Sequence, residues 1–178
     1  MKDDIDGLVS VPPVTKRMSP TGKIILYIIV LVCIAGTITT VTTWQSRNKG
    51  DLHWEDTTQL PEVKAAPPMV SSEAPESSEA YIAPFICRGK ADYALTKLLE
   101  LLERNPQYLR IRVTDGQIQA VAETSLLKYQ DDVIFQARSN PERIEVFSSS
   151  RVGINDFGSN RDRIEEIREI LLQWQVLK

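Results

Sequence analysis

The sequence predicts an α+β domain that follows a single transmembrane helix and a disordered-type linker. Two observations support this prediction. An uncharged apolar stretch lies near the N-terminus, and the C-terminal part shows helical and alternating apolar patterns in the order helix, four strands, helix. A chain of 178 residues has room for one small domain and its attachments. The expected packing is a four-stranded antiparallel meander with both helices on one face.

The apolar stretch lies between Lys23 and Arg47, which are separated by 23 uncharged residues. As a helix, residues 24–44 would be roughly 32 Å long, enough to cross the hydrocarbon core of a bilayer. Trp44 stands at its end, where an aromatic side chain favours the membrane interface. Residues 1–23 are acidic in part, and no small-x-small cleavage site follows the stretch. An uncleaved signal anchor is therefore favoured over a cleaved signal peptide or a buried soluble helix.

The charges beside this helix predict its orientation. Three basic residues precede it and two follow it, namely Lys16, Arg17 and Lys23, then Arg47 and Lys49. This positive-inside bias predicts a cytoplasmic N-terminus and an extracytoplasmic C-terminal domain, in a periplasm or a lumen. Gly36 and the nearby threonines would let a second membrane helix approach closely.

Residues 45–80 are expected to form an extended acidic tether. They contain four prolines and the run SSEAPESSE, with three basic and seven acidic residues. Such a composition buries too little apolar surface to offset the entropy of ordering. Trp54 is expected at the membrane interface, like Trp44, or on a partner. His53 has no cysteine or second histidine near it, so no metal site is predicted there.

Residues 81–178 form the predicted domain, with 14 basic and 14 acidic residues. This neutral balance provides no electrostatic surface for nucleic acid. Helices are expected at about 90–104 and 161–175, and Ser159 or Asn160 would cap the second. The apolar face of the first helix comprises Ala91, Ala94, Leu95, Leu98, Leu99, Leu101 and Leu102, and that of the second Ile164, Ile167, Ile170, Leu171 and Trp174.

Strands are expected at 108–114, about 117–127, 133–138 and 143–149. In the first, strict alternation places Leu109, Ile111 and Val113 on one face, and Asp115-Gly116 then predicts a hairpin turn. Residues 81–87 fit a short edge strand, because Pro84 argues against a central one. The inward side chains of the second strand are expected to be Ile118, Ala120, Ala122 and Thr124.

Three motifs stand out in the segments 120–138 and 144–171: the paired acids Asp131 and Asp132, SSSRVG at 148–153 and DFGSNRDRI at 156–164. With these motifs the segments resemble a bacterial and plastid family known as domain of unknown function 1499. The resemblance covers roughly 100 residues, and Phe147 stands where the family often has arginine. It implies an extracytoplasmic or envelope-associated module with no established activity. The matching residues are Asp131, Asp132, Ser148, Ser150, Arg151, Gly153, Asp156, Phe157, Gly158, Asn160, Arg163 and Ile164.

The densest polar segment, residues 148–160, has three interpretations. As a ligand site, a helix N-terminus at Gly158 and nearby arginines would hold phosphate or carboxylate. As structure, Arg151 would pair with Asp156 or Asp132, and Asn160 would be a cap. As a docking surface, it would contact a protein. The structural interpretation is favoured, and the binding candidates are Ser150, Arg151, Gly153, Asp156, Gly158, Asn160, Arg161 and Arg163.

No catalytic residue, metal site or cofactor is predicted. Asp131 and Asp132 would point to opposite faces of a strand, so a turn with a salt bridge to Arg151 is favoured over a shared ion. The single histidine lies in the tether, which leaves the serines without a local base. Cys87 has no neighbouring histidine, and Cys33 in the membrane cannot bridge to it.

These observations predict a single-pass, membrane-anchored accessory or interaction protein. It would be a non-catalytic subunit or stabilising factor of an integral membrane or envelope complex, in contact with membrane lipid. The alternative is a binding module for an anionic ligand or a lipid headgroup at residues 151–163. A hydrolase is disfavoured.

Overall fold

The computed structural model describes residues 18–49, 59–64, 68–125, 127–153 and 155–178, so His53 and Trp54 lie outside the described residues. The chain divides into two compact units, Met1–Thr37 and Ile38–Lys178. The elements in order are α1 (Pro20–Asn48), β1 (Met69–Ser71), β2 (Phe85–Ile86), α2 (Ala91–Arg104), β3 (Tyr108–Thr114), β4 (Gln117–Glu123), β5 (Gln130–Ser139), β6 (Glu142–Ser150) and α3 (Ser159–Gln173).

Helix α1 is the long apolar helix that the sequence predicts, extended beyond 24–44 at both ends. At its start, the hydroxyl of Ser19 accepts a hydrogen bond from the amide of Gly22 at 3.1 Å. Within it, the hydroxyl of Thr37 donates to the carbonyl of Cys33 at 2.8 Å, which satisfies a polar group without solvent. Within the described ranges, α1 alone is long and apolar enough to cross a membrane, and its most apolar window is not buried.

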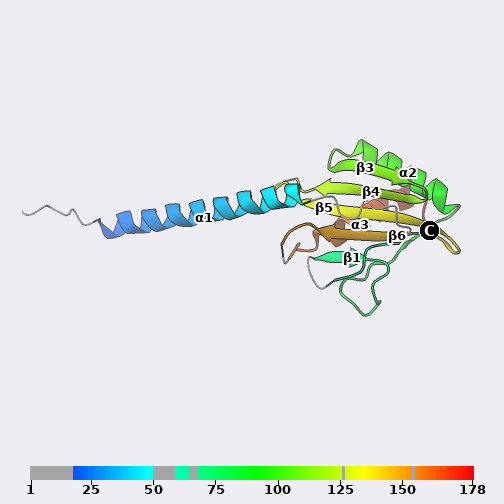
Figure 1. Cartoon of the computed structure of the whole chain (residues 1–178), viewed down its shortest axis with the longest axis horizontal. Coiled ribbons are helices and arrows are strands. Elements are labelled where there is room, and N and C mark those ends of the chain that lie inside the picture. The colour runs from blue at the N-terminus through cyan, green and yellow to red at the C-terminus, as the bar shows by residue number, and fades with distance from the viewer. Residues whose placement is uncertain (1–17, 50–58, 65–67, 126, 154) are drawn as a thin grey trace, which may run out of the picture. The chain divides into compact units, whose positions relative to one another are not determined.

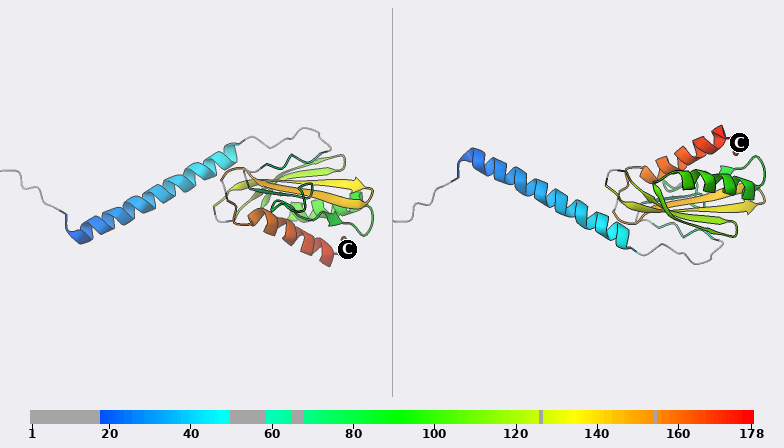
Figure 2. Two further views of the ribbon diagram at one scale, coloured as in Figure 1. Left: turned by 90° about the horizontal axis from the view of Figure 1, so that it is seen from below. Right: turned by 90° about the horizontal axis from the view of Figure 1, so that it is seen from above.

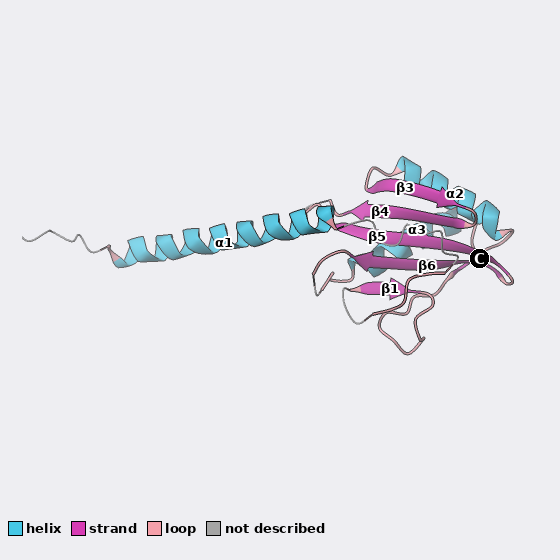
Figure 3. Cartoon of the chain, viewed as in Figure 1, coloured by secondary structure: helices cyan, strands magenta, loops and turns pink. Residues whose placement is uncertain are grey.

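The sheet has six strands rather than four. Its order is β1-β6-β5-β4-β3 and all neighbours are antiparallel (Figures 1 and 3). The short strand β2 also pairs with β6. Strands β3 to β6 form the expected meander. Strand β5 begins three residues earlier than predicted, which places Asp131 and Asp132 inside the strand and not in a turn.

Helices α2 and α3 cover the same face of the sheet, as expected (Figure 2). Leu98 and Leu102 from α2, and Ile164 and Leu171 from α3, are fully buried in the core. The sheet meets them with apolar side chains that alternate along its strands, because successive residues point to opposite faces. Of the inward side chains predicted for the second strand, Ile118, Ala120 and Ala122 are confirmed. The prediction is wrong for Thr124, because β4 ends at Glu123 and Thr124 is only partly buried beyond it. The other core side chains of the sheet are Val133, Phe135, Ile144 and Val146.

The strict alternation predicted for β3 is wrong. The register passes from Leu109 opposite Val121 to Arg112 opposite Gln119, so β3 contains one extra residue. Arg110 takes a φ of 48° at this bulge. As a result Tyr108 packs on the core, where burial raises the pKa of its hydroxyl to about 12.

The disordered-type linker prediction is wrong for the part that follows residue 67. Strand β1 pairs with β6, so that Met69 lies opposite Ser149 and Ser71 opposite Phe147. Val70 and Ala74 are buried. Leu60, which lies earlier in the predicted tether, packs with Ile134, Phe147 and Met69 on the sheet face opposite the helices. The fold therefore begins well before residue 81.

We expect Val70→Ala in the full chain to lower the free energy of unfolding by about 2 kcal/mol, because Val70 is 5% exposed in the core. The matched control is Val113→Ala in β3, where the side chain is 53% exposed and the loss should be at most about 1 kcal/mol. Urea denaturation measures both. Equal losses at the two positions would show that β1 is not part of the stable fold.

Candidate functional site: two buried polar networks

The polar motif is divided between the two faces of the sheet. In the register of β5 and β6, Asp131 lies opposite Ser150 and Asp132 opposite Ser149. Because neighbouring residues of a strand point to opposite faces, Asp131 and Ser150 face the helices, whereas Asp132 and Ser149 face away from them. The prediction that the two aspartates diverge is confirmed.

On the helix face, Arg163 of α3 connects the two strands. Its guanidinium donates to Asp131 Oδ2 at 2.5 Å, to Ser148 Oγ at 3.0 Å and to Asn160 Oδ1 at 2.9 Å. The Ser148 hydroxyl donates to the same Asn160 oxygen at 2.6 Å. A charged and hydrogen-bonded arginine satisfies these buried acceptors, so the network fixes α3 against the sheet.

Asn160 and Asp156 complete this network at the start of α3. The side-chain amide of Asn160 donates to Asp156 Oδ2 at 2.7 Å and to Ser150 Oγ at 3.0 Å. The Asp156 carboxylate also accepts the backbone amides of Gly158 and Asn160, at 3.2 and 3.0 Å. Gly158 is the N-cap residue of α3 and Asp156 accepts the first amides, so the predicted caps Ser159 and Asn160 are wrong. Partial burial raises the pKa of Asp156, but these hydrogen bonds outweigh it and hold the pKa below its usual value.

On the opposite face, Arg151 and Asp132 form a bidentate ion pair. Arg151 Nε donates to Asp132 Oδ2 at 2.9 Å, and Nη2 donates to Oδ1 at 2.6 Å. The two side chains are 0% and 5% exposed. Of the two partners predicted for Arg151, the structure selects Asp132, while Asp156 serves the other network. A buried arginine needs this planar two-bond geometry to offset the loss of water.

The same arginine holds the end of α1. Arg151 Nη1 donates to the carbonyl of Lys49 at 3.0 Å, and Lys49 Nζ donates to the carbonyl of Arg151 at 2.7 Å. One turn earlier, the buried Ser46 hydroxyl accepts the amide of Gln130 at 2.6 Å. Nothing in the sequence pattern predicted that Ser46 and Lys49 contact the sheet, since both lay in the predicted tether.

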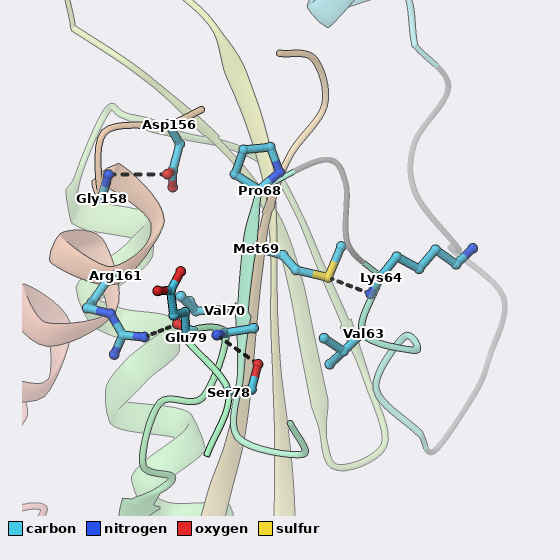
Figure 4. Close-up of a pocket in the computed structure, with 11 residues that line it drawn as sticks. Val63, Lys64, Pro68, Met69, Val70, Ser78, Glu79, Asp156, Gly158 and Arg161 are labelled. Atoms are coloured by element: carbon cyan, nitrogen blue, oxygen red, sulfur yellow. Dashed lines mark hydrogen bonds between the residues drawn. The ribbon is translucent and has the colours of Figure 1, made fainter. Parts of the chain in front are cut away.

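A cavity of about 510 Å³ lies beside the start of α3 (Figure 4). Its charged lining is balanced, with Lys64 and Arg161 against Glu79 and Asp156. Arg161 donates to the backbone carbonyl of Glu79 at 2.8 Å, which fixes the adjacent loop. The helix amides that could bind an anion already bond to Asp156. The cavity therefore provides no concentrated positive charge.

Gly153 and Cys87, two further positions considered in the sequence, have structural explanations. Gly153 takes a φ of 96° in the loop after β6, a conformation that side chains rarely adopt. Cys87 is buried. Its burial, and to a smaller extent the charge of the nearby Glu142, raises the pKa of its thiol to about 11. The thiol is therefore unreactive in the folded chain. Among the described residues, no group of three or more His, Cys, Asp or Glu side chains could hold a metal ion.

The family model of a protein of unknown function (DUF1499) matches residues 59–171. The chain belongs to this family. The match begins at residue 59, which agrees with the packing of Leu60 on the sheet. No curated protein and no solved structure matches the chain. Most of the polar residues that carried the resemblance lie in the two buried networks, namely Asp131, Asp132, Ser148, Ser150, Arg151, Asp156, Asn160 and Arg163.

We expect Arg151→Met to lower the free energy of unfolding by about 3–5 kcal/mol, because it leaves the Asp132 carboxylate buried without its cation. Adding Asp132→Leu should recover part of this loss, since the orphaned charge is removed with it. Chemical denaturation of the full chain measures both variants.

The matched control is Arg104→Met, which removes an arginine that is 70% exposed from its pair with Glu100. Its cost should stay below about 1 kcal/mol, because solvent screens the pair. A loss at Arg151 no larger than at Arg104 would contradict the assigned role of the buried pair.

Proposed function

We propose that this DUF1499 protein is a single-pass, membrane-anchored accessory protein. Its domain would serve as a non-catalytic interaction module for an integral membrane or envelope complex. The N-terminus would be cytoplasmic and the domain extracytoplasmic, in line with the three basic residues before the apolar stretch 24–44 and the two after it.

The lipid-facing role of α1 is supported by its uncovered apolar surface. Large side chains from Ile24 to Val41 are exposed along the helix. Exposing such a continuous apolar surface to water is costly, whereas a bilayer accepts it. The helical backbone and the threonine hydroxyls satisfy their own hydrogen bonds within the helix.

The proposal of a non-catalytic role rests on one observation. The polar residues that carried the family resemblance bond to one another and to neighbouring elements of the fold. Arg151 bonds to Asp132 and to Lys49, while Arg163 bonds to Asp131. Asn160 and Asp156 bond to each other and to the start of α3. A catalytic group needs access to a substrate, whereas these side chains hold strands, helices and the end of α1 together.

The attachment of α1 supports a role close to the membrane. Ser46 and Lys49 bond to Gln130 and Arg151, so the domain begins where the apolar helix ends. A domain attached in this way would contact a membrane complex beside its own anchor rather than a distant partner.

The alternative, an anion or lipid headgroup bound at residues 151–163, is less well supported. An anion at the start of α3 would have to displace the Asp156 carboxylate from the amides of Gly158 and Asn160. A free carboxylate next to the bound anion would also repel it.

The experiment is a mild detergent extraction of the tagged full-length protein from its native membrane, followed by native sizing and mass spectrometry. We expect stoichiometric co-migration with one membrane complex. A control chain in which an unrelated apolar helix replaces residues 24–41 separates recognition by the anchor from recognition by the domain. Migration of the wild-type chain as a lone species of 20.1 kDa would contradict the proposal.

A further inference from the structure

Phe157 is the most exposed large apolar side chain among the described residues, with 89% of its surface accessible. Its backbone takes a φ of 53°, a left-handed conformation that is strained for a bulky residue. The amide of Phe157 donates to Asn155 Oδ1 at 2.7 Å, and the preceding Asp156 is held by the amides of Gly158 and Asn160. The fold thus holds an aromatic side chain outward.

The loop of Phe157 lies at the same end of the sheet as the β4–β5 loop. Strand β4 ends at Glu123, β5 begins at Gln130 and β6 ends at Ser150, and both loops extend from this end (Figures 1 and 2). Leu127 in the β4–β5 loop is 42% exposed. This end of the domain therefore carries exposed apolar side chains from two separate loops.

The end of α1 contacts the same end of the sheet. Moving back along the helix, Lys49 bonds to Arg151, Ser46 to Gln130, and the Thr43 hydroxyl donates to the carbonyl of Leu127 at 3.1 Å. Thr43 precedes Trp44, the last residue of the stretch long enough to span a bilayer. Leu127 therefore lies beside the part of α1 that would meet the membrane boundary.

The charges at this end favour anionic headgroups. Arg47 and Lys128 both pair with the same carboxylate, that of Glu123, at 3.4 and 3.3 Å. Their side chains are about half exposed, at 49% and 53%. One acid cannot neutralise two cations, so positive charge remains beside Leu127. Basic residues next to exposed Phe and Leu are the combination that binds a lipid interface.

We propose that this end of the domain rests on the lipid surface, with Phe157 and Leu127 inserted among the headgroups and Arg47 and Lys128 close to their phosphates. The inference rests on the proposed membrane anchoring and adds a second, peripheral contact of the domain with the bilayer. It would fix the height of the domain above the membrane and leave its other surfaces for a partner. This contact explains why Phe157 points outward although its backbone is strained.

The test places a single nitrobenzoxadiazole fluorophore on the full-length chain in vesicles of phosphatidylcholine and phosphatidylglycerol. Cys33 is replaced by alanine, while Cys87 is kept, because its buried thiol stays unlabelled as long as the chain is folded. The fluorophore is attached in turn at Phe157→Cys, at Val113→Cys as the matched exposed apolar control, and at Ile29→Cys in α1. Val113 lies at the opposite end of the sheet, next to the β3–β4 turn.

We expect a blue-shifted emission at position 157 and quenching by lipids that carry a nitroxide near the headgroup. The quenching should be several-fold stronger than at position 113. Lipid contact at position 29 with a water-like signal at 157 would overturn this inference alone and would leave the anchor in place. Water-like signals at both positions would overturn the anchoring itself.

Discussion

The buried ion pair of Arg151 and Asp132 is the constraint on which the other contacts at this end of the molecule depend. Two buried charges are stable only when they pair with each other. The two hydrogen bonds between Arg151 and Asp132 form only in the observed register of β5 and β6. The remaining guanidinium nitrogen then bonds to the carbonyl of Lys49. One side chain thus links the centre of the sheet to the end of the apolar helix.

The same register determines the second network. With Asp132 on one face, Asp131 must lie on the other, where Arg163 of α3 reaches it. The small side chain of Ser148 leaves room for Asn160 and the arginine beside it. The pairing of β5 with β6 therefore positions both α3 and the end of α1.

The sequence predicted the helices and strands in which apolar residues recur at a regular spacing. Helices α2 and α3, the meander and the divergence of Asp131 from Asp132 follow from local patterns. Strand β1 could not be predicted, because it has two apolar residues and prolines before and after it. The bulge in β3 depends on the backbone of Arg110, which alternation does not reveal. The contacts of Ser46 and Lys49 join residues 84 and 102 positions apart, and no periodicity reports such pairs.

The central claim is that Arg151 couples α1 to the sheet, and a distance measurement tests it most directly. Spin labels at Val41→Cys in α1 and Glu103→Cys in α2, in a full chain with Cys33 replaced, report the separation by pulsed electron paramagnetic resonance in nanodiscs. We predict one narrow distance distribution for this chain and a broad one when Arg151→Lys is added, because lysine cannot form the planar paired contact. Distributions of equal width in the two chains would contradict the account.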